Sequence, residues 1–374
     1  MPGHTYCTEL LRRHLVAFAA NFARWLDPEM ALKWHLFCAR HPLFFAADER
    51  DPQVLRTRLW GLPLSNPLGL SAGFDKNAES VDGLHLCGFG FVEVGTVTPL
   101  PQTGNQKPRI TRLREDNALI NRYNPSAGIS EVAKALQGLA RRRPFGVNVG
   151  PMAGTADAEA NYVSGIRELG PLADYVCVNV SNPTVASDAV EGTAIGQLLR
   201  RLRKEVDALP PGPTGSVPPF VLKVGHDLSP VQREEVAREA LAQRIDGLIV
   251  SNASLARPAS LRSPTARAEA GGLSGAPLRD HALAALGDFY RLTEGKVPLI
   301  GSGGVRSGKD AYERIRAGAS AVQVYTAFAY DGLGVLPRIK GELALLLEAD
   351  GFSCVADAVG ADHVSRSASA RSKA

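Results

Sequence analysis

Cysteine is scarce in this sequence and is not arranged as a metal site. The five cysteines, Cys7, Cys38, Cys87, Cys177 and Cys354, are widely spaced, and none forms a C-x-x-C pair. Structural zinc sites and disulfide frameworks both need paired or closely spaced cysteines, so the sequence argues against both. We therefore expect no metal, and this cysteine usage fits a reducing compartment.

Long apolar runs and a strong net charge are also lacking. No run of about 18 apolar residues occurs, so no helix is expected to cross a bilayer. The formal net charge of +4 on 374 residues is too small to favour a nucleic-acid partner. What is present, 45% hydrophobic and 21% charged residues, is typical of a soluble globular protein.

The first 60 residues form a helical region of their own. Residues 10–26 place apolar side chains on one helical face and arginines elsewhere, which is typical of a helix lying in a membrane interface. A helix packed on its own domain would show the same pattern, and an arginine-bearing start also resembles the end of a mitochondrial targeting segment. A second amphipathic helix is predicted over 28–44, with Asp27 as its cap and Pro28 at its first position.

Eight short apolar segments follow, and helix-like segments separate most of them. Because these runs are continuously apolar, they predict strands buried on both faces, as in a parallel sheet. Their number predicts an α/β fold, a (β/α)8 TIM barrel over residues 61–350, with its site at the carboxyl ends of the strands. A doubly wound open sheet is the alternative, and we expect residues 351–374 to be a largely disordered tail. The predicted strand segments are 68–73, 89–98, 145–150, 174–181, 219–225, 246–252, 297–302 and 320–326.

Glycines and hydroxyls at the last two strands suggest a phosphate site. The seventh predicted strand ends in 301-GSGGV-305, whose glycines let backbone N–H groups approach an anion. Tyr325 and Thr326 at the end of the eighth strand add hydroxyl and amide donors. Barrels commonly bind phosphate with these two loops, although a tight turn would explain the glycines equally well.

Polar side chains also interrupt the apolar strands. Lys223 lies inside the fifth strand, where a charge is costly unless it meets an anion or an electron-rich ligand, or reaches the surface. Lys76 follows the first strand. Asn148, Asn179 and Asn252 lie at or near the ends of three other strands, and together they could bind the edge of a planar heterocycle.

Several longer motifs, taken together, resemble those of the class 2, quinone-linked dihydroorotate dehydrogenases. The resemblance runs from about residue 27 to 363, and the N-terminal helices are what separates class 2 from the soluble class 1 enzymes. The matching stretches are 66-NPLGLSAGFDKNAE-79, 95-GTVTPLPQTGNQKPR-109, 119-LINRY-123, 271-GGLSG-275, 301-GSGGV-305 and 318-GASAVQVYTA-327.

The resemblance implies a flavoprotein oxidoreductase of pyrimidine biosynthesis that oxidises dihydroorotate with quinone. In the family, residues matching 1–60 form a membrane-associated lid that admits quinone, at the mitochondrial inner membrane in eukaryotes or the cytoplasmic membrane in bacteria. Arg112 matches the arginine at the quinone entrance, whereas a histidine common in the second lid helix is Leu32 here. The FMN positions implied are Ala72, Gly73, Lys76, Thr96, Asn148, Asn179, Lys223, Ser251, Gly275, Gly304, Tyr325 and Thr326.

The substrate-binding positions implied by the family are only partly preserved. Lys76, Asn121, Asn179 and Asn252 match the residues that bind orotate. Three stretches depart from the family pattern. The family's N-R-Y-G-F-N reads 121-NRYNPS-126, its threonine after Asn252 is Ala253, and its G-K-N is 150-GPM-152.

The motif that carries the catalytic base differs most. In the family's N-V-S-S-P-N-T the second serine removes the C5 proton of dihydroorotate. Aligned without gaps, 179-NVSNPTV-185 puts Asn182 at the base and Thr184 at a substrate contact, and an amide cannot accept that proton. With a slip of one residue, Ser181 becomes the base and Asn182 the contact. A lost base costs about 10²–10⁴-fold in rate.

Three hypotheses follow from these departures. The protein is a membrane-associated dihydroorotate dehydrogenase, an FMN oxidoreductase with another small cyclic substrate, or a flavoprotein that has lost its chemistry. The retained lysines and asparagines favour the first two, because a structural role has no use for such a polar ring.

Overall fold

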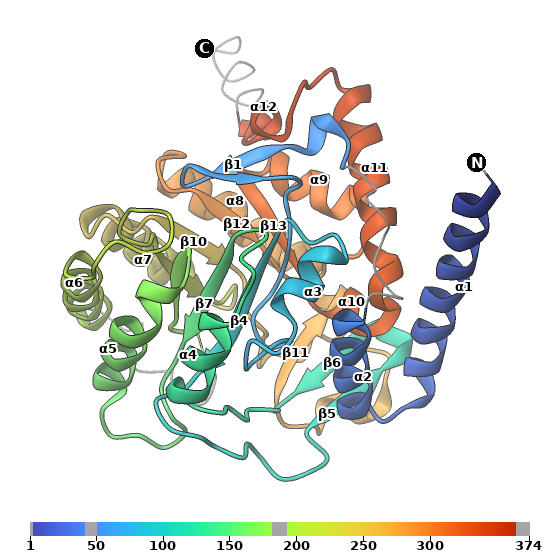
Figure 1. Cartoon of the computed structure of the whole chain (residues 1–374). Helices are drawn as coiled ribbons and strands as arrows, with labels where there is room; N and C mark the ends of the chain where they lie inside the picture. Colours follow the sequence, from blue (N-terminus) through green and yellow to red (C-terminus); the bar gives the residue numbers. More distant parts are fainter. Residues whose placement is uncertain (1–2, 42–50, 182–192, 364–374) are drawn as a thin grey trace.

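The computed structural model describes residues 3–41, 51–181 and 193–363. Its centre is a closed barrel of eight parallel strands in the order β10-β12-β13-β3-β4-β7-β8-β9 (Figure 1). The (β/α)8 barrel and each of its eight predicted strand segments are therefore confirmed. The barrel strands are β3 Leu68–Leu70, β4 Phe91–Val97, β7 Phe145–Val149, β8 Tyr175–Asn179, β9 Phe220–Val224, β10 Gly247–Val250, β12 Leu299–Gly301 and β13 Ala319–Val324.

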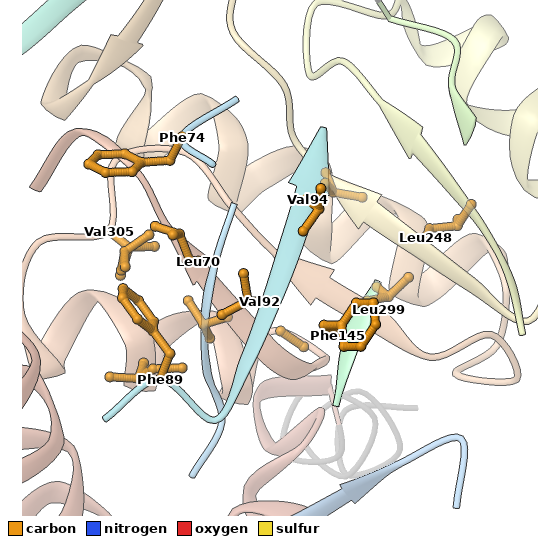
Figure 2. Close-up of a cluster of buried hydrophobic side chains, with 14 of the residues drawn as sticks. Leu70, Phe74, Phe89, Val92, Val94, Phe145, Leu248, Leu299 and Val305 are labelled. Atoms are coloured by element: carbon orange, nitrogen blue, oxygen red, sulfur yellow. The ribbon is translucent and has the colours of Figure 1, made fainter. Parts of the chain in front are cut away.

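Helices surround the barrel and bury its outer face. Leu70 of β3 and Val92 and Val94 of β4 belong to the main hydrophobic core, part of which Figure 2 shows. The continuous apolar runs arise because alternate residues of each strand face these helices while the others face the barrel interior. The helices after the N-terminal region are α3 Val81–Leu86, α4 Ile129–Gln137, α5 Ala158–Leu169, α6 Thr193–Asp207, α7 Pro230–Ala242, α8 Arg279–Leu292, α9 Gly308–Arg316, α10 Thr326–Asp331, α11 Val335–Ala349 and α12 Val355–Ala358, with short 3-10 helices at Gln53–Leu55, Arg114–Asp116, Gly170–Leu172, Pro264–Arg267, Ala276–Leu278 and Gly332–Gly334.

The lower interior of the barrel is apolar and closed. Phe91, Tyr175 and Ile249 belong to a second buried cluster inside the strands. A Cβ at Gly146 would lie 2.1 Å from the Tyr175 ring, so glycine is required there for the ring to fit. A hairpin of β1 Thr57–Leu59 and β2 Leu62–Leu64 contributes Leu59 and Leu64 to the same cluster. This packing leaves ligand access to the opposite, carboxyl end of the strands.

The N-terminal region is two helices, α1 Gly3–Trp25 and α2 Pro28–Arg40. As predicted, Asp27 caps α2, and its side chain accepts a hydrogen bond from the Glu29 backbone N–H (3.0 Å). Buried Glu29 then accepts two hydrogen bonds from Arg109, at 2.7 and 2.9 Å, which fixes α2 against the barrel domain. Within the described residues, neither of these helices nor any other is long and apolar enough to cross a membrane.

A small antiparallel sheet beside the barrel was not predicted. Its strands are β5 Ile110–Leu113, β6 Ala118–Asn121 and β11 Gly272–Gly275, in the order β11-β6-β5. Strands β6 and β11 pair across about 150 residues of sequence, so no local pattern indicates that they belong to one sheet. The sheet brings Arg112, Asn121 and Gly275, three predicted site residues, to one edge of the barrel mouth.

The folded part of the chain also extends past the predicted boundary at residue 350. The short helix α12 lies within 351–363, and His363 stacks on Tyr290 with ring centroids 4.8 Å apart. Arg316 binds Asp362 at 2.7 Å. These long-range contacts order a segment whose local composition predicted a tail, while residues 364–374 lie outside the described residues.

Candidate active site

A cavity of about 410 Å³ lies at the carboxyl end of the barrel strands. The carboxyl ends of the barrel strands and the loops that follow them form most of its wall, and β6 and β11 contribute further residues. Most of the predicted site residues line it, although they come from nine different segments of the chain. These residues are Ala72, Gly73, Lys76, Thr96, Asn121, Asn179, Lys223, Ser251, Asn252, Gly275, Gly304, Tyr325 and Thr326.

Several predicted residues are placed differently. Asn148 lies behind the cavity wall, and Ser181 is beside the cavity without being part of its lining. Arg112 lines a separate pocket of about 270 Å³ next to α1. Asn182 and Thr184 lie outside the described residues, so the two registers of the base motif stay predictions.

Lys223 forms the floor of the cavity together with a buried carboxylate. Lys223 and Glu93 are 2% and 0% exposed, and Nζ lies 3.7 Å from Glu93 Oε1. Nζ also donates a hydrogen bond to Ser71 Oγ (3.0 Å). The lysine is therefore not at the surface, and its cost of burial is offset by a charge partner below and by the cavity above.

Glu93 is held by uncharged donors on three other strands. It accepts hydrogen bonds from Asn148 Nδ2 (2.9 Å), Tyr175 OH (3.1 Å) and Gln323 Nε2 (2.8 Å). The buried carboxylate is thus fully engaged, as a charge in a barrel interior must be. Glu93 and Lys223 both lie on the interior face of their strands. They therefore form a polar layer between the cavity and the apolar lower interior of the barrel.

The Asn148 side chain connects this layer to the cavity wall. Its amide oxygen accepts a hydrogen bond from Thr96 Oγ1 (2.7 Å), and its NH₂ group lies 3.3 Å from Cys177 Sγ as well as bonding Glu93. Thr96 lines the cavity and Asn148 does not, so this hydrogen bond is what connects Asn148 to the cavity wall.

The other asparagines form hydrogen bonds across the cavity mouth. Asn179 Oδ1 accepts from Ser181 Oγ (3.0 Å) and from Asn252 Nδ2 (3.3 Å), which links the ends of β8 and β10. Asn121 Nδ2 donates to Tyr325 OH (3.1 Å), which links the small sheet to the end of β13. Amide groups from three elements are thereby held in fixed orientations around one cavity.

Lys76 is an unpaired cation in the cavity wall. It has no hydrogen-bond or ion-pair partner among residues 3–41, 51–181 and 193–363, and burial lowers its pKa to about 8. The neighbouring Asp75 does not neutralise it, because that carboxylate accepts hydrogen bonds from the backbone N–H groups of Glu79 and Ser80, both at 2.8 Å. A half-buried ammonium without a counterion favours an anionic ligand.

The loop after β12 is shaped for close approach of an anion. Gly304 has a φ of +75°, and a Cβ there would lie 2.7 Å from the Arg279 backbone. Buried Arg314 donates to the carbonyl oxygens of Gly303 and Arg279 and so supports the loop from behind. Backbone and hydroxyl donors from this loop and from Thr326 can therefore face one anionic group.

One acceptor in the cavity lacks a donor. Gln323 lines the cavity and uses its NH₂ group on Glu93, while its buried Oε1 has no partner in the described structure. Buried amide oxygens are normally hydrogen-bonded, so we expect this oxygen to accept a hydrogen bond from an N–H group of a ligand. The cavity thus fits a ligand with a ring N–H, an electron-rich ring and an anionic tail, which are the features of a flavin phosphate.

Arg112 is tied to the N-terminal helices. Its guanidinium donates to the carbonyl oxygens of Ala23 (3.0 Å) and Leu26 (2.9 Å) at the end of α1. The pocket that it lines is rich in arginine and is completed by Tyr330 and Asp331 of α10. Arg112 therefore marks the junction between the helical region and the barrel mouth.

Sequence reasoning missed Glu93 and Gln323, although a signal was present. Each is a polar residue inside a continuous apolar strand, 91-FVEVG-95 and 321-AVQVY-325, the same feature that identified Lys223. A third missed residue, His226, directly follows β9 and is 5% exposed.

Comparisons with known proteins agree with this geometry. A family model described as dihydroorotate dehydrogenase matches residues 54–347. The "Dihydroorotate dehydrogenase (quinone)" of Rhodospirillum rubrum is 48% identical over 343 residues, covering 90% of this chain and 92% of the relative. The mitochondrial protein of that name from Mus musculus is 45% identical, covering 91% and 88%. The crystal structure of DHODH in complex with ferulenol from Eimeria tenella superposes with a TM-score of 0.85 at 40% identity, covering 90% of this chain and 96% of that one.

Proposed function

This chain belongs to the dihydroorotate dehydrogenase family of oxidoreductases, and from that premise we propose that it oxidises dihydroorotate to orotate with FMN and a quinone. The step belongs to pyrimidine biosynthesis. The single observation that carries the proposal is the joint placement of Lys76, Lys223 and the asparagines around one cavity.

The residues present fit FMN. When bound, FMN supplies an electron acceptor that takes a hydride from substrate and passes electrons to quinone. Lys223 would face its ring system and stabilise the negative charge that the ring gains on reduction. The free Gln323 oxygen would accept a hydrogen bond from a ring N–H, and the loop at Gly304 with Thr326 would hold its phosphate. The ion pair with Glu93 would hold the Lys223 side chain in this orientation.

Other polar groups of the same cavity would bind the substrate. Dihydroorotate carries a carboxylate, which Lys76 would pair with, and ring amides, which the asparagines can both donate to and accept from. Asn121, Asn179 and Asn252 are already oriented by hydrogen bonds to the protein, which lowers the cost of ordering them on binding.

Anaerobic bleaching of the bound flavin tests this function. Purified protein is expected to be yellow and to lose the visible absorbance of oxidised flavin when dihydroorotate is added without oxygen. A quinone added afterwards should restore the colour. Protein that stays yellow with dihydroorotate would contradict the substrate, and protein that cannot be loaded with FMN would contradict the cofactor.

One feature of the cavity favours an alternative substrate, another small cyclic acid in place of dihydroorotate. Ala253 and Leu255 line it, and the side chain of neither offers a hydrogen bond to a ligand. If dihydroorotate fails while the protein holds FMN, another small cyclic acid that needs fewer polar contacts becomes the substrate to test, by the same bleaching assay.

Within residues 1–60, helices α1 and α2 would associate with a membrane surface and admit quinone, whereas β1 belongs to the closed end of the barrel. Residues 61–350 would form the FMN-binding barrel, and the segment from 351 would be a C-terminal extension. Phe18, Phe22 and Trp25 recur on one face of α1 and are 63%, 40% and 90% exposed. Such an aromatic stripe suits a membrane interface. We therefore propose a location at the cytoplasmic membrane of a bacterium or the mitochondrial inner membrane of a eukaryote.

Removing the stripe should weaken membrane binding. The double variant Phe18→Ala/Trp25→Ala is expected to bind phospholipid vesicles at least roughly tenfold less tightly, because each large apolar side chain contributes about 1.5–3 kcal/mol when buried. Vesicle co-sedimentation measures this. Val231→Ala, which removes a 72% exposed side chain from α7, is the matched control and should not change binding. Equal sedimentation of all three proteins would argue against a membrane role for α1.

A further inference from the structure

A histidine lies directly behind the cavity wall and contacts one of its serines. His226 Nδ1 is 2.9 Å from Ser251 Oγ, and its Nε2 is 3.3 Å from Asp227 Oδ1. The imidazole is buried, whereas the Asp227 side chain is 46% exposed and accepts a hydrogen bond from Ser254 Oγ (2.9 Å). Ser251, His226 and Asp227 therefore link the cavity to solvent.

The carboxylate decides how the imidazole is protonated. A proton on Nε2 is favoured by the negative charge of Asp227, which leaves the lone pair of Nδ1 pointing at Ser251. The Ser251 hydroxyl then donates to Nδ1, and its oxygen is left to accept a proton from the cavity. This is the arrangement by which a histidine and a carboxylate activate a serine.

Ser181, the serine predicted as base, has different surroundings. Its hydroxyl donates to the Asn179 amide oxygen (3.0 Å) and lies 3.4 Å from the Lys223 carbonyl oxygen. Neither group can take up a proton at neutral pH. Among the hydroxyls that line the cavity in the described structure, Ser251 is the one that contacts an imidazole.

We infer that Ser251, His226 and Asp227 form a proton relay that serves as the general base of this site. The inference rests on the proposed function and specifies its proton-accepting residues, which would otherwise be missing if Asn182 replaces the family's serine. Ser251 is the catalytic residue, and His226 and Asp227 act through it.

The relay would carry out the proton transfer of the dehydrogenation, as distinct from the hydride transfer. The C5–H bond of dihydroorotate breaks and its proton goes to Ser251 Oγ, while the hydroxyl proton of Ser251 moves to His226 Nδ1. The electron pair left at C5 would form the C5=C6 double bond as C6 gives up a hydride, for which bound FMN would be the acceptor. The proton on Nε2 of the resulting imidazolium then passes to Asp227 and to solvent.

The charges around His226 set the pH range of the relay. Burial lowers the pKa of His226, with smaller lowering contributions from His281 and Arg233, while Asp227 opposes them and raises it. His226 is therefore mostly neutral at pH 7 and able to accept a proton. Because the protonated imidazole cannot accept another proton, proton abstraction should have an acid limb, and the lowered pKa moves that limb to a pH below the ordinary histidine value of about 6.5.

Proton abstraction can be measured apart from oxidation. The C5 protons lie next to a ring carbonyl, so the FMN-loaded protein in D₂O should exchange deuterium into C5 of dihydroorotate, as followed by NMR and mass spectrometry. We expect Ser251→Ala and His226→Gln to slow this exchange by about 10²–10⁴-fold and to remove its acid limb. Ser251→Thr, which keeps the hydroxyl, should restore most of the rate.

His281→Gln is the matched control. His281 is exposed, and its ring lies 6.4 Å from the His226 ring, so it should alter exchange by less than about twofold, as expected for a residue that transfers no proton. Flavin content and circular dichroism of each variant establish that the fold is kept.

Each combination of results decides between the two proposals. If deuterium exchange depends on Ser251 but the flavin is not bleached, the relay is supported and the proposed oxidation of dihydroorotate is contradicted. If dihydroorotate still bleaches the flavin of Ser251→Ala, or if bleaching is lost only in Ser181→Ala, the proposed oxidation is supported and the relay is overturned. Wild-type protein that shows neither exchange nor bleaching overturns both.

Discussion

Lys223→Met is expected to lower the free energy of unfolding by about 3–5 kcal/mol, because it leaves a buried carboxylate without its cation. Glu93 is 0% exposed, and its remaining contacts to Asn148, Tyr175 and Gln323 are uncharged donors. Urea denaturation followed by circular dichroism measures the change. The variant should also lose FMN, since the cavity floor loses its charge.

The double variant Lys223→Met/Glu93→Gln is the control for this prediction. Removing both charges should recover most of the lost stability, since the amide introduced in place of the carboxylate can still pair with the surrounding polar groups, while FMN binding stays weak. If Lys223→Met alone is as stable as the wild type, the pairing seen at 3.7 Å does not compensate the buried charge.

Lys76→Met should selectively weaken binding of the anionic ring. A hydrogen bond to a charged group contributes about 1.5–3 kcal/mol, so orotate affinity is expected to fall about 10- to 150-fold. Titration of the flavin absorbance with orotate measures the dissociation constant. Lys76→Arg, which keeps the positive charge, should lose less affinity. FMN content is measured for each variant and the orotate titration is referred to the FMN-loaded fraction, because Lys76 is also an implied FMN position.

The pH dependence of the same titration provides a second test. Burial lowers the pKa of Lys76 to about 8. A carboxylate binds the protonated lysine, so wild-type affinity for orotate should fall as the pH rises through about 8, whereas Lys76→Met should show no such loss. Identical pH profiles for the two proteins would mean that Lys76 does not pair with the ligand carboxylate.

Local patterns predicted the barrel because its strands are unusual. The runs at 145–150 and 219–225 are apolar at nearly every position, which only a strand covered on both faces requires. The same logic identified Lys223, since a charge in such a run needs a partner. Glu93 carried the same signal in 91-FVEVG-95, but its partner lies on a distant strand of the barrel and could not be assigned from sequence.

The antiparallel strands of the small sheet gave a weaker signal. Strands β6 and β11 are four residues each, and their pairing joins Ala118–Asn121 to Gly272–Gly275. Strands as short as these take their conformation from the partner strand rather than from their own periodicity. The sheet nonetheless decides where Asn121 lies relative to Tyr325.

The amino-acid sequence by itself determined the barrel, the family and most of the residues that line the cavity. Each of these follows from patterns within single segments, such as an apolar run, a glycine loop or a motif. Tertiary structure alone decided that Glu93 lies next to Lys223, that Asn148 contacts Thr96 from behind the cavity wall, and that His226 contacts Ser251 rather than the solvent. The physical reason is closure of the barrel, which brings residues from separate strands within hydrogen-bonding distance and so creates pairings that no single segment encodes.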